Sequence, residues 1–102
     1  MSVVVVATIT PLHEHTDEVI AAYTEVIPLV HAEDGCELYA LHQAPDRLIM
    51  VEKWASREAL SAHSTGPALA AMRPKIAGKT AGPADVVVLD AVPAGDPVKG
   101  QL

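Results

Sequence analysis

The sequence predicts an α+β protein of the ferredoxin-like class, with its elements in the order β-α-β-β-α-β and four antiparallel strands in one sheet. Four short apolar segments have the composition of strands, and two segments with helical spacing alternate with them. A turn sequence joins the middle two strands directly, which predicts a hairpin. With 102 residues, the chain has room for one hydrophobic core.

The first part of the chain supplies a strand and a long helix. Residues 2–10 (SVVVVATIT) are rich in β-branched side chains and almost continuously apolar, which predicts a strand covered on both faces. Thr16 or Asp17 is expected to cap the next helix, whose apolar residues recur at helical spacing as far as Val30. Pro28 is expected to kink or shorten the last turn of this helix.

The middle of the chain supplies the hairpin. Its predicted strands are residues 36–43 and 48–55, joined by the turn sequence APDR. Ser56 is a suitable N-cap for a helix over residues 57–63. Residues 84–92 (ADVVVLDAV) have the composition of the fourth strand.

Glycine and proline mark the remaining boundaries. The Gly-Pro pair at 66–67 interrupts the second helical region, and residues 68–76 are expected to add one or two turns that stop at Pro74. We assign residues 1–93 to the folded domain. Residues 94–102, rich in proline and glycine, form a C-terminal tail that is either flexible or packed on a partner subunit.

Helices can cover only one face of such a sheet, yet apolar residues occur on both faces. Along the third strand, alternate residues share one face: Leu48, Met50, Glu52 and Trp54. The intervening positions on the other face are also mostly apolar. A bare apolar face of this size is rare on a monomer. We therefore expect a homodimer in which two such faces pack together and enclose a cavity.

Composition argues against several kinds of partner. The net charge of −6, with scattered Lys and Arg residues, disfavours nucleic acids and anionic membranes. The longest aliphatic runs are far shorter than the roughly 20 residues that span a bilayer. The single cysteine, Cys36, fits a reducing compartment, so a cytoplasmic location is expected. His13 and His15 have no third ligand at a suitable spacing, so we expect no metal site.

Trp54 and His63 are the main candidates for chemistry, and each has two interpretations. Trp54 either fills space in the core or an interface, or its indole forms a flat wall for a planar ligand. His63 lies on the last turn of the helix that follows Trp54. It either faces solvent, where a cationic histidine suits a helix C-terminus, or acts as a general base.

Three other residues are candidates to bind a substrate. Glu52 shares the strand face of Trp54, and a buried carboxyl must be paired or protonated; a salt bridge to a basic residue is its alternative. Tyr39 and His42 fall on opposite faces of the second strand, so at most one of them shares a pocket with Trp54. Arg73 either reaches an acidic substrate or partner, or is an ordinary solvated helix residue.

Three segments resemble the antibiotic biosynthesis monooxygenase family: EDGCELYALH (33–42), LIMVEKWAS (48–56) and EALSAH (58–63). The resemblance runs from the first predicted strand through the fourth. It implies a dimeric α+β barrel that oxidises electron-rich phenolic or quinol-like compounds with molecular oxygen, using neither metal nor flavin. The implied partners are a second copy of the chain, a small aromatic substrate and molecular oxygen, with no cofactor.

The resemblance assigns the catalytic positions to Trp54 and His63, with Glu52 in support. The chain contains no asparagine: Met50 stands where anthrone-type members place one, and Leu60 stands where they carry a tyrosine. Loss of one donor to a developing oxyanion is worth roughly 10² to 10³ in rate. Haem cleavage by an Asn-Trp-His set is therefore disfavoured. The predicted substrate-binding residues are Trp54, Glu52, Met50, Tyr39, Leu60 and Arg73.

Three functions remain open at this point. The first is a cofactor-independent monooxygenase acting on a quinol-like or anthrone-like substrate. The second is a non-catalytic dimeric barrel that binds a small apolar metabolite. The third is a non-oxidative isomerase that uses His63 and a carboxylate for proton transfer.

Overall fold

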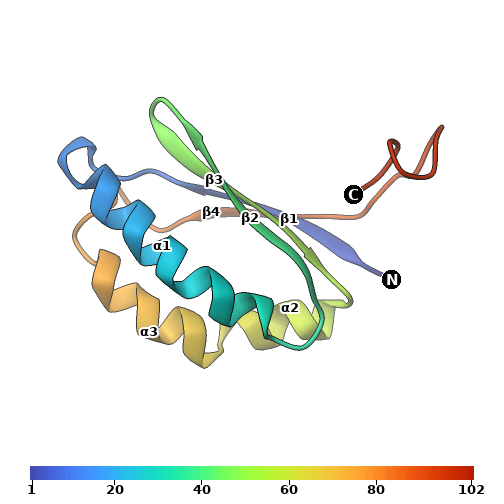
Figure 1. Cartoon of the computed structure of the whole chain (residues 1–102), viewed down its shortest axis with the longest axis horizontal. Helices are drawn as coiled ribbons and strands as arrows, with labels where there is room; N and C mark the ends of the chain where they lie inside the picture. The colour runs from blue at the N-terminus through green and yellow to red at the C-terminus, as the bar shows by residue number, and fades with distance from the viewer.

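Four antiparallel strands and a layer of helices make up the computed structural model, which describes all 102 residues and confirms the predicted class. The strands are β1 (Val3–Ile9), β2 (Cys36–Ala44), β3 (Arg47–Trp54) and β4 (Asp85–Leu89), in the spatial order β2-β3-β1-β4. The helices are α1 (Thr16–His31), α2 (Arg57–Ser64) and α3 (Pro67–Ile76), all on one side of the sheet (Figure 1). The sheet of one chain is open, so a dimeric barrel stays a prediction.

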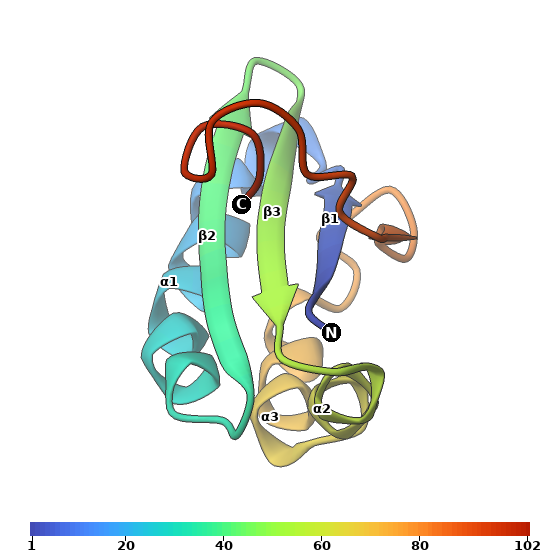
Figure 2. The ribbon, with the colours of Figure 1, turned by 90° about the vertical axis from the view of Figure 1, so that its right-hand side faces the viewer.

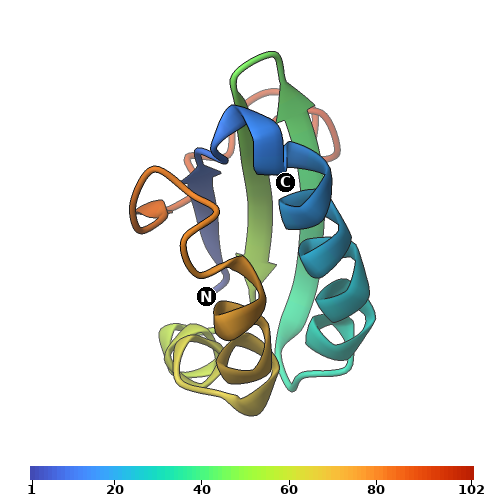
Figure 3. The same ribbon diagram turned by 90° about the vertical axis from the view of Figure 1, so that its left-hand side faces the viewer.

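The core lies between the helices and the inner face of the sheet. Figure 3 shows α1 along β2, with α2 and α3 gathered near the end of β3. The largest fully buried side chains come from both layers: Trp54, Leu48, Met50, Val5, Val19 and Val30. Because strand residues alternate between faces, Val6 and Thr8 point outward and are only half-buried. The prediction that the first strand is covered on both faces is therefore wrong for a single chain.

The start of α1 differs from the prediction. A single turn of 3₁₀ helix, η1 (His13–His15), runs directly into α1, so the N-cap is His15 and no side chain caps it. Thr16 is already helical, and its hydroxyl donates to the carbonyl of His13 at 3.1 Å. The expected cap at Thr16 or Asp17 is therefore wrong. The expected cap of α2 is confirmed, because the Ser56 hydroxyl accepts the backbone N–H of Ala59.

Neither internal proline ends its helix. α1 continues past Pro28 to His31, and α3 continues past Pro74 to Ile76. Pro28 is exposed, whereas its neighbours Val26 and Val30 are buried. We infer that their packing holds the last turn of α1 in place despite the missing N–H. None of the helices combines the length and apolar character needed to cross a bilayer.

The fourth strand is shorter than predicted, because it ends at Leu89 instead of Val92. β4 pairs with β1 only over Val4 to Thr8, and all five β4 residues are exposed. The chain then returns to the outer face of the sheet, in front of β2 and β3 (Figure 2). There the Lys53 ammonium donates to the carbonyl of Leu102 at 2.6 Å. Packing of this tail on a partner subunit stays a prediction.

The turn between α1 and β2 is held against the start of α2. Gly35 has a φ of +81°, in the left-handed region that favours glycine. A Cβ at this position would lie 2.5 Å from the Cβ of Ala59. The Gly35 carbonyl also accepts the backbone N–H of Ala55 at 2.8 Å. The turn therefore needs glycine for its backbone angle and for this close approach.

The substitution Gly35→Ala tests this close approach, with Gly78→Ala as a matched control. Gly78 has a φ of +75° but open space around it. Both variants are expected to lose about 1–2 kcal/mol from left-handed strain. Gly35→Ala should lose a further 1–3 kcal/mol, roughly, from overpacking against Ala59. Urea denaturation measures both losses, and equal losses would contradict the contact.

Candidate active site

Glu52 lies at the centre of the inner face of the sheet. The register places it opposite Tyr39 of β2 on one side and Val5 of β1 on the other. Residues directly opposite each other on antiparallel strands share a face, so all three side chains face the helices. The period-two pattern of β3 thus brings a carboxyl group under the helix layer.

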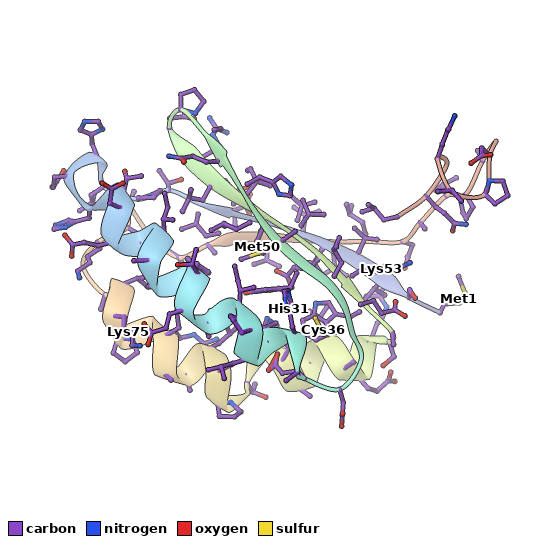
Figure 4. All side chains as sticks on the ribbon, in the orientation of Figure 1. Met1, His31, Cys36, Met50, Lys53 and Lys75 are labelled. Carbon is purple, nitrogen blue, oxygen red and sulfur yellow. The ribbon has the colours of Figure 1, made fainter.

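A cavity of about 550 Å³ lies between this face and the helices, and its lining is mostly hydrophobic. Every predicted site residue except Trp54 lines it: Tyr39, Met50, Glu52, Leu60, His63 and Arg73. Figure 4 shows Met50 in the layer between sheet and helices. The sheet and helices of one chain thus already form a cavity around these residues, and a further cavity between two sheets stays a prediction.

Trp54 lies behind the cavity wall. Its side chain is 0% exposed, and its ring is tilted by 31° against that of His63, with 4.5 Å between the ring centroids. Tyr39 contacts the same imidazole edge-on at a centroid distance of 5.3 Å. The indole therefore supports His63 instead of facing a ligand. The expectation that Trp54 forms a flat wall for the substrate is wrong in this chain.

His63 lies between two carboxyl groups. Its Nδ1 is 2.6 Å from Oε1 of Glu33, and its Nε2 is 4.0 Å from Oε1 of Glu52. That same Glu52 oxygen accepts the indole N–H of Trp54 at 2.9 Å. His63 is only 4% exposed, so the alternative of a solvent-facing histidine is wrong. Glu52 is hydrogen-bonded by the indole and lies near the imidazole, without the Lys or Arg partner considered as its alternative.

The cavity favours the neutral forms of its acids. Burial raises the pKa of the Glu52 carboxyl and outweighs the opposing effects of the Trp54 hydrogen bond and of positive charge on His63. Burial also raises the pKa of the Tyr39 and Tyr23 phenols, and negative charge on Glu52 adds to both shifts.

Arg73 lies at the edge of this cavity, on α3. It is exposed, and its Nη2 donates to the backbone carbonyl of Ser64 at 2.9 Å. The guanidinium thus has donors left for a ligand. It is the only Lys or Arg that lines the cavity, opposite in charge to any anion formed there. No group of three or more His, Cys, Asp or Glu side chains is placed to hold a metal ion.

Two residues of the site were missed by sequence reasoning. Tyr23 belongs to the buried side of α1, and it also lines the cavity. Glu33 follows the end of α1 and contacts His63 across 30 positions of sequence. The periodicity of α1 indicated the inward direction of Tyr23. No spacing in the sequence indicates the contact between Glu33 and His63, because only the folded turn brings them together.

The fold and the site define a ferredoxin-like α+β protein with an apolar cavity that contains a buried carboxyl and a histidine. The family model described as antibiotic biosynthesis monooxygenase matches residues 2–75. The chain therefore belongs to the antibiotic biosynthesis monooxygenase family.

Individual relatives agree with this assignment. The probable quinol monooxygenase YgiN of Escherichia coli is 29% identical over 79 residues, which cover 67% of this chain and 76% of that protein. The structure of Rv0793 from Mycobacterium tuberculosis has a TM-score of 0.84 and 26% identity, covering 94% of this chain and 100% of that chain. A crystal structure described as an antibiotic biosynthesis monooxygenase has a TM-score of 0.81 and 28% identity, covering 89% of this chain and 99% of that chain.

The raised pKa of Glu52 predicts a pH dependence of stability. The folded chain holds this proton more tightly than the unfolded chain, whose carboxyl has the ordinary pKa of 4.5. The free-energy cost of burying the charged carboxylate is absent below that pKa, and it grows as the pH rises through the folded pKa. We therefore expect the unfolding free energy of the wild type to fall, relative to Glu52→Gln, between about pH 4 and pH 7.

Urea denaturation of both proteins at the two pH values measures this difference. Gln at position 52 keeps an oxygen that accepts the indole N–H, so the comparison isolates the ionisable proton. Glu37→Gln, at an exposed position of β2, is the control for general charge effects. A wild type and a Glu52→Gln variant whose stabilities change in parallel would contradict the burial argument.

Proposed function

We propose that this chain is a cofactor-independent monooxygenase that oxidises a small quinol-like or anthrone-like aromatic substrate with molecular oxygen. Family membership and the similarity to a quinol monooxygenase support the class of reaction. The observation that carries the proposal is a neighbouring pair, Glu52 and His63, buried in the wall of an apolar cavity. Such a cavity excludes water from a reactive anion.

In the proposed reaction, the substrate itself supplies the electrons. It first loses an acidic proton, and the resulting anion passes an electron to oxygen. Where the reacting carbon is a methylene, its two hydrogens are replaced by one oxygen atom as a carbonyl, and the second oxygen atom leaves as water. The four electrons that reduce the oxygen molecule all come from that carbon. The protein has to bind the substrate, accept its proton and stabilise the anion.

His63 and Glu52 divide these two tasks. His63 has Nδ1 directed at Glu33 and Nε2 on the side of Glu52, so Nε2 is the atom that accepts the substrate proton. Oε1 of Glu52 is taken up by the indole of Trp54. A protonated Glu52 has an O–H left to donate to the anion. This donor takes the place of the missing asparagine, because Met50 lies on the same strand face and has no N–H to offer.

The remaining predicted residues shape the binding site. Met50, Leu60 and Tyr39 supply apolar and aromatic walls of the cavity. Arg73 is assigned to an acidic group of the substrate, or to the negative charge that develops on it. A substrate that suits this cavity is therefore an apolar ring system with an ionisable hydroxyl or methylene.

Oxygen consumption tests the proposed activity. Purified protein free of metal and flavin is expected to consume oxygen with a quinol or an anthrone faster than the compound oxidises alone. His63→Ala should lower this excess rate by roughly 10²-fold to 10⁴-fold, because it removes the base. Trp54→Phe should lower it less, because the imidazole loses part of its support. Equal oxygen uptake with and without protein across a panel of quinols would refute the activity.

Matched variants test the individual roles in the same assay. His42→Ala changes an exposed histidine outside the cavity and should leave the rate unchanged. Glu52→Gln keeps a hydrogen-bond donor, whereas Glu52→Leu should lose roughly 10² to 10³ in rate. Arg73→Ala should raise KM most for substrates with an acidic group. Unchanged rates in both His63→Ala and Glu52→Leu would show that the residues are assigned wrongly.

We also propose that two copies of the chain associate through the edge that carries β4. Val86, Val87, Val88 and Leu89 are each at least 41% exposed. Val87 and Leu89 lie opposite Val6 and Val4 on the outer face, so this apolar surface continues onto β1. Contiguous apolar surface of this kind marks protein interfaces.

Sedimentation velocity tests this association. The wild type is expected to sediment as a dimer at micromolar concentration, and Val87→Lys as a folded monomer, because it places a charge in the apolar interface. Val98→Lys is the control, since Val98 is also an exposed valine but lies in the tail, away from β4. A wild type that stays a well-folded monomer at every concentration would refute the dimer.

A proton-transfer isomerase is the second candidate function. The specific observation in its favour is a buried acid next to a histidine, which suits removal of a proton at one atom and its return at another. Solvent deuterium that appears in a carbonyl compound without oxygen uptake would favour this activity. Ligand-induced thermal stabilisation without either reaction would instead favour a non-catalytic binding protein.

A further inference from the structure

We propose that Glu33 is a positioning residue for His63. Its carboxylate holds the imidazole in the tautomer that keeps a lone pair on Nε2, and it balances the charge when His63 takes up a proton. The role deepens the proposed function and rests on it, because it treats His63 as the base. Glu33 itself lies outside the cavity lining.

The backbone brings Glu33 to His63 through a tightly defined turn. The Glu33 N–H donates to the carbonyl of Val30 at 3.0 Å, and the Glu33 carbonyl accepts the N–H of Cys36 at 3.2 Å. Gly35 docks the same turn against the start of α2. A Cβ on Gly66, at the other end of α2, would lie 3.5 Å from Oε2 of Glu33. The carboxylate is thus enclosed between the turn and the end of α2.

The short contact determines which nitrogen of His63 carries the proton. An ionised carboxylate only accepts hydrogen bonds, so a partner at 2.6 Å requires a proton on Nδ1. In a neutral imidazole the other nitrogen, Nε2, then carries a lone pair. The 4.0 Å between Nε2 and Glu52 is too long for a direct hydrogen bond, so Glu52 does not use up this lone pair. Nε2 therefore stays available as a base.

The same contact stabilises the protonated histidine. When the substrate O–H or C–H bond breaks, the proton forms a new bond to Nε2, while the proton on Nδ1 stays in place. The imidazolium is buried, with His63 only 4% exposed, and a buried charge needs an opposite charge nearby. The Glu33 side chain is 20% exposed, so it keeps part of its hydration while it supplies that charge. Glu33 gains no proton in this step.

The tautomer of His63 in the wild-type protein is the first test. Nitrogen-15 NMR of the labelled protein distinguishes a protonated Nδ1 from a protonated Nε2, in the alkaline range where imidazoles are neutral. The signal of His63 is assigned by its loss in His63→Gln. The expected result is a proton on Nδ1. A proton on Nε2 in the folded wild type would overturn the proposal without any variant of Glu33.

The substitution Glu33→Gln is the second test. The new glutamine can turn its N–H₂ toward Nδ1 of His63, which moves the imidazole proton to Nε2. We expect a shift toward the Nε2-protonated form and a fall in kcat of roughly 10²-fold to 10⁴-fold, with KM nearly unchanged. Glu33→Asp, which keeps the carboxylate, should retain the tautomer. Asp34→Asn removes a neighbouring exposed charge from the same turn and should change neither quantity.

The two readouts separate this inference from the proposed function. If no quinol is oxidised by the wild type, the proposed function fails, and the NMR spectra still decide whether Glu33 sets the tautomer. If oxidation occurs and Glu33→Gln lowers kcat without changing the tautomer, Glu33 does not set the tautomer of His63 and the proposal is overturned. If Glu33→Gln melts at a much lower temperature than Asp34→Asn, its loss of activity could come from unfolding. The tautomer of His63 in the wild type and in Glu33→Asp then decides whether the Glu33 carboxylate sets it.

Discussion

The hydrogen bond between the Trp54 indole and the Glu52 carboxyl is the interaction on which the candidate site depends. A carboxyl group on the inner face of a sheet is costly to bury, and it is tolerated only with a partner or a proton. The indole N–H satisfies one oxygen at 2.9 Å. The bulk of the same indole fills the space behind His63 and positions the imidazole beside the carboxyl. The Trp54 side chain therefore both satisfies the buried Glu52 carboxyl and positions His63 beside it.

Much of this arrangement was predictable from local sequence patterns. The period-two alternation of β3 placed Met50, Glu52 and Trp54 on one face of the strand, and the Ser56 cap fixed the start of α2. Which face lies under the helices, and that Glu52 therefore lies near His63, is seen only in the structure. The element order follows from the hairpin turn and the helical stripe of α1. Patterns of this kind depend only on residues that are close in sequence. They can therefore be recognised without knowledge of the tertiary structure.

Other features depend on contacts between distant segments, and the sequence does not contain them in readable form. Trp54 was expected to face a ligand, but the strand face it shares with Glu52 leads beneath α2, where His63 covers it. Glu33 follows the end of α1, and only the docking of Gly35 on Ala59 brings its carboxylate close to the histidine. Pro28 has a local tendency to end a helix, yet the buried residues on either side of it outweigh that tendency.

The edge of the sheet at β4 would link the proposed dimer to the proposed chemistry. Val86 lines the cavity, and its neighbours on β4 are exposed on both faces of the sheet. A second chain that covered this edge would therefore also cover one wall of the cavity. Removal of water from that wall strengthens every electrostatic interaction inside, including those of Glu52 and His63. Loss of the proposed interface would then weaken stability and the proposed catalysis together, although no residue of β4 is assigned to the proton transfer.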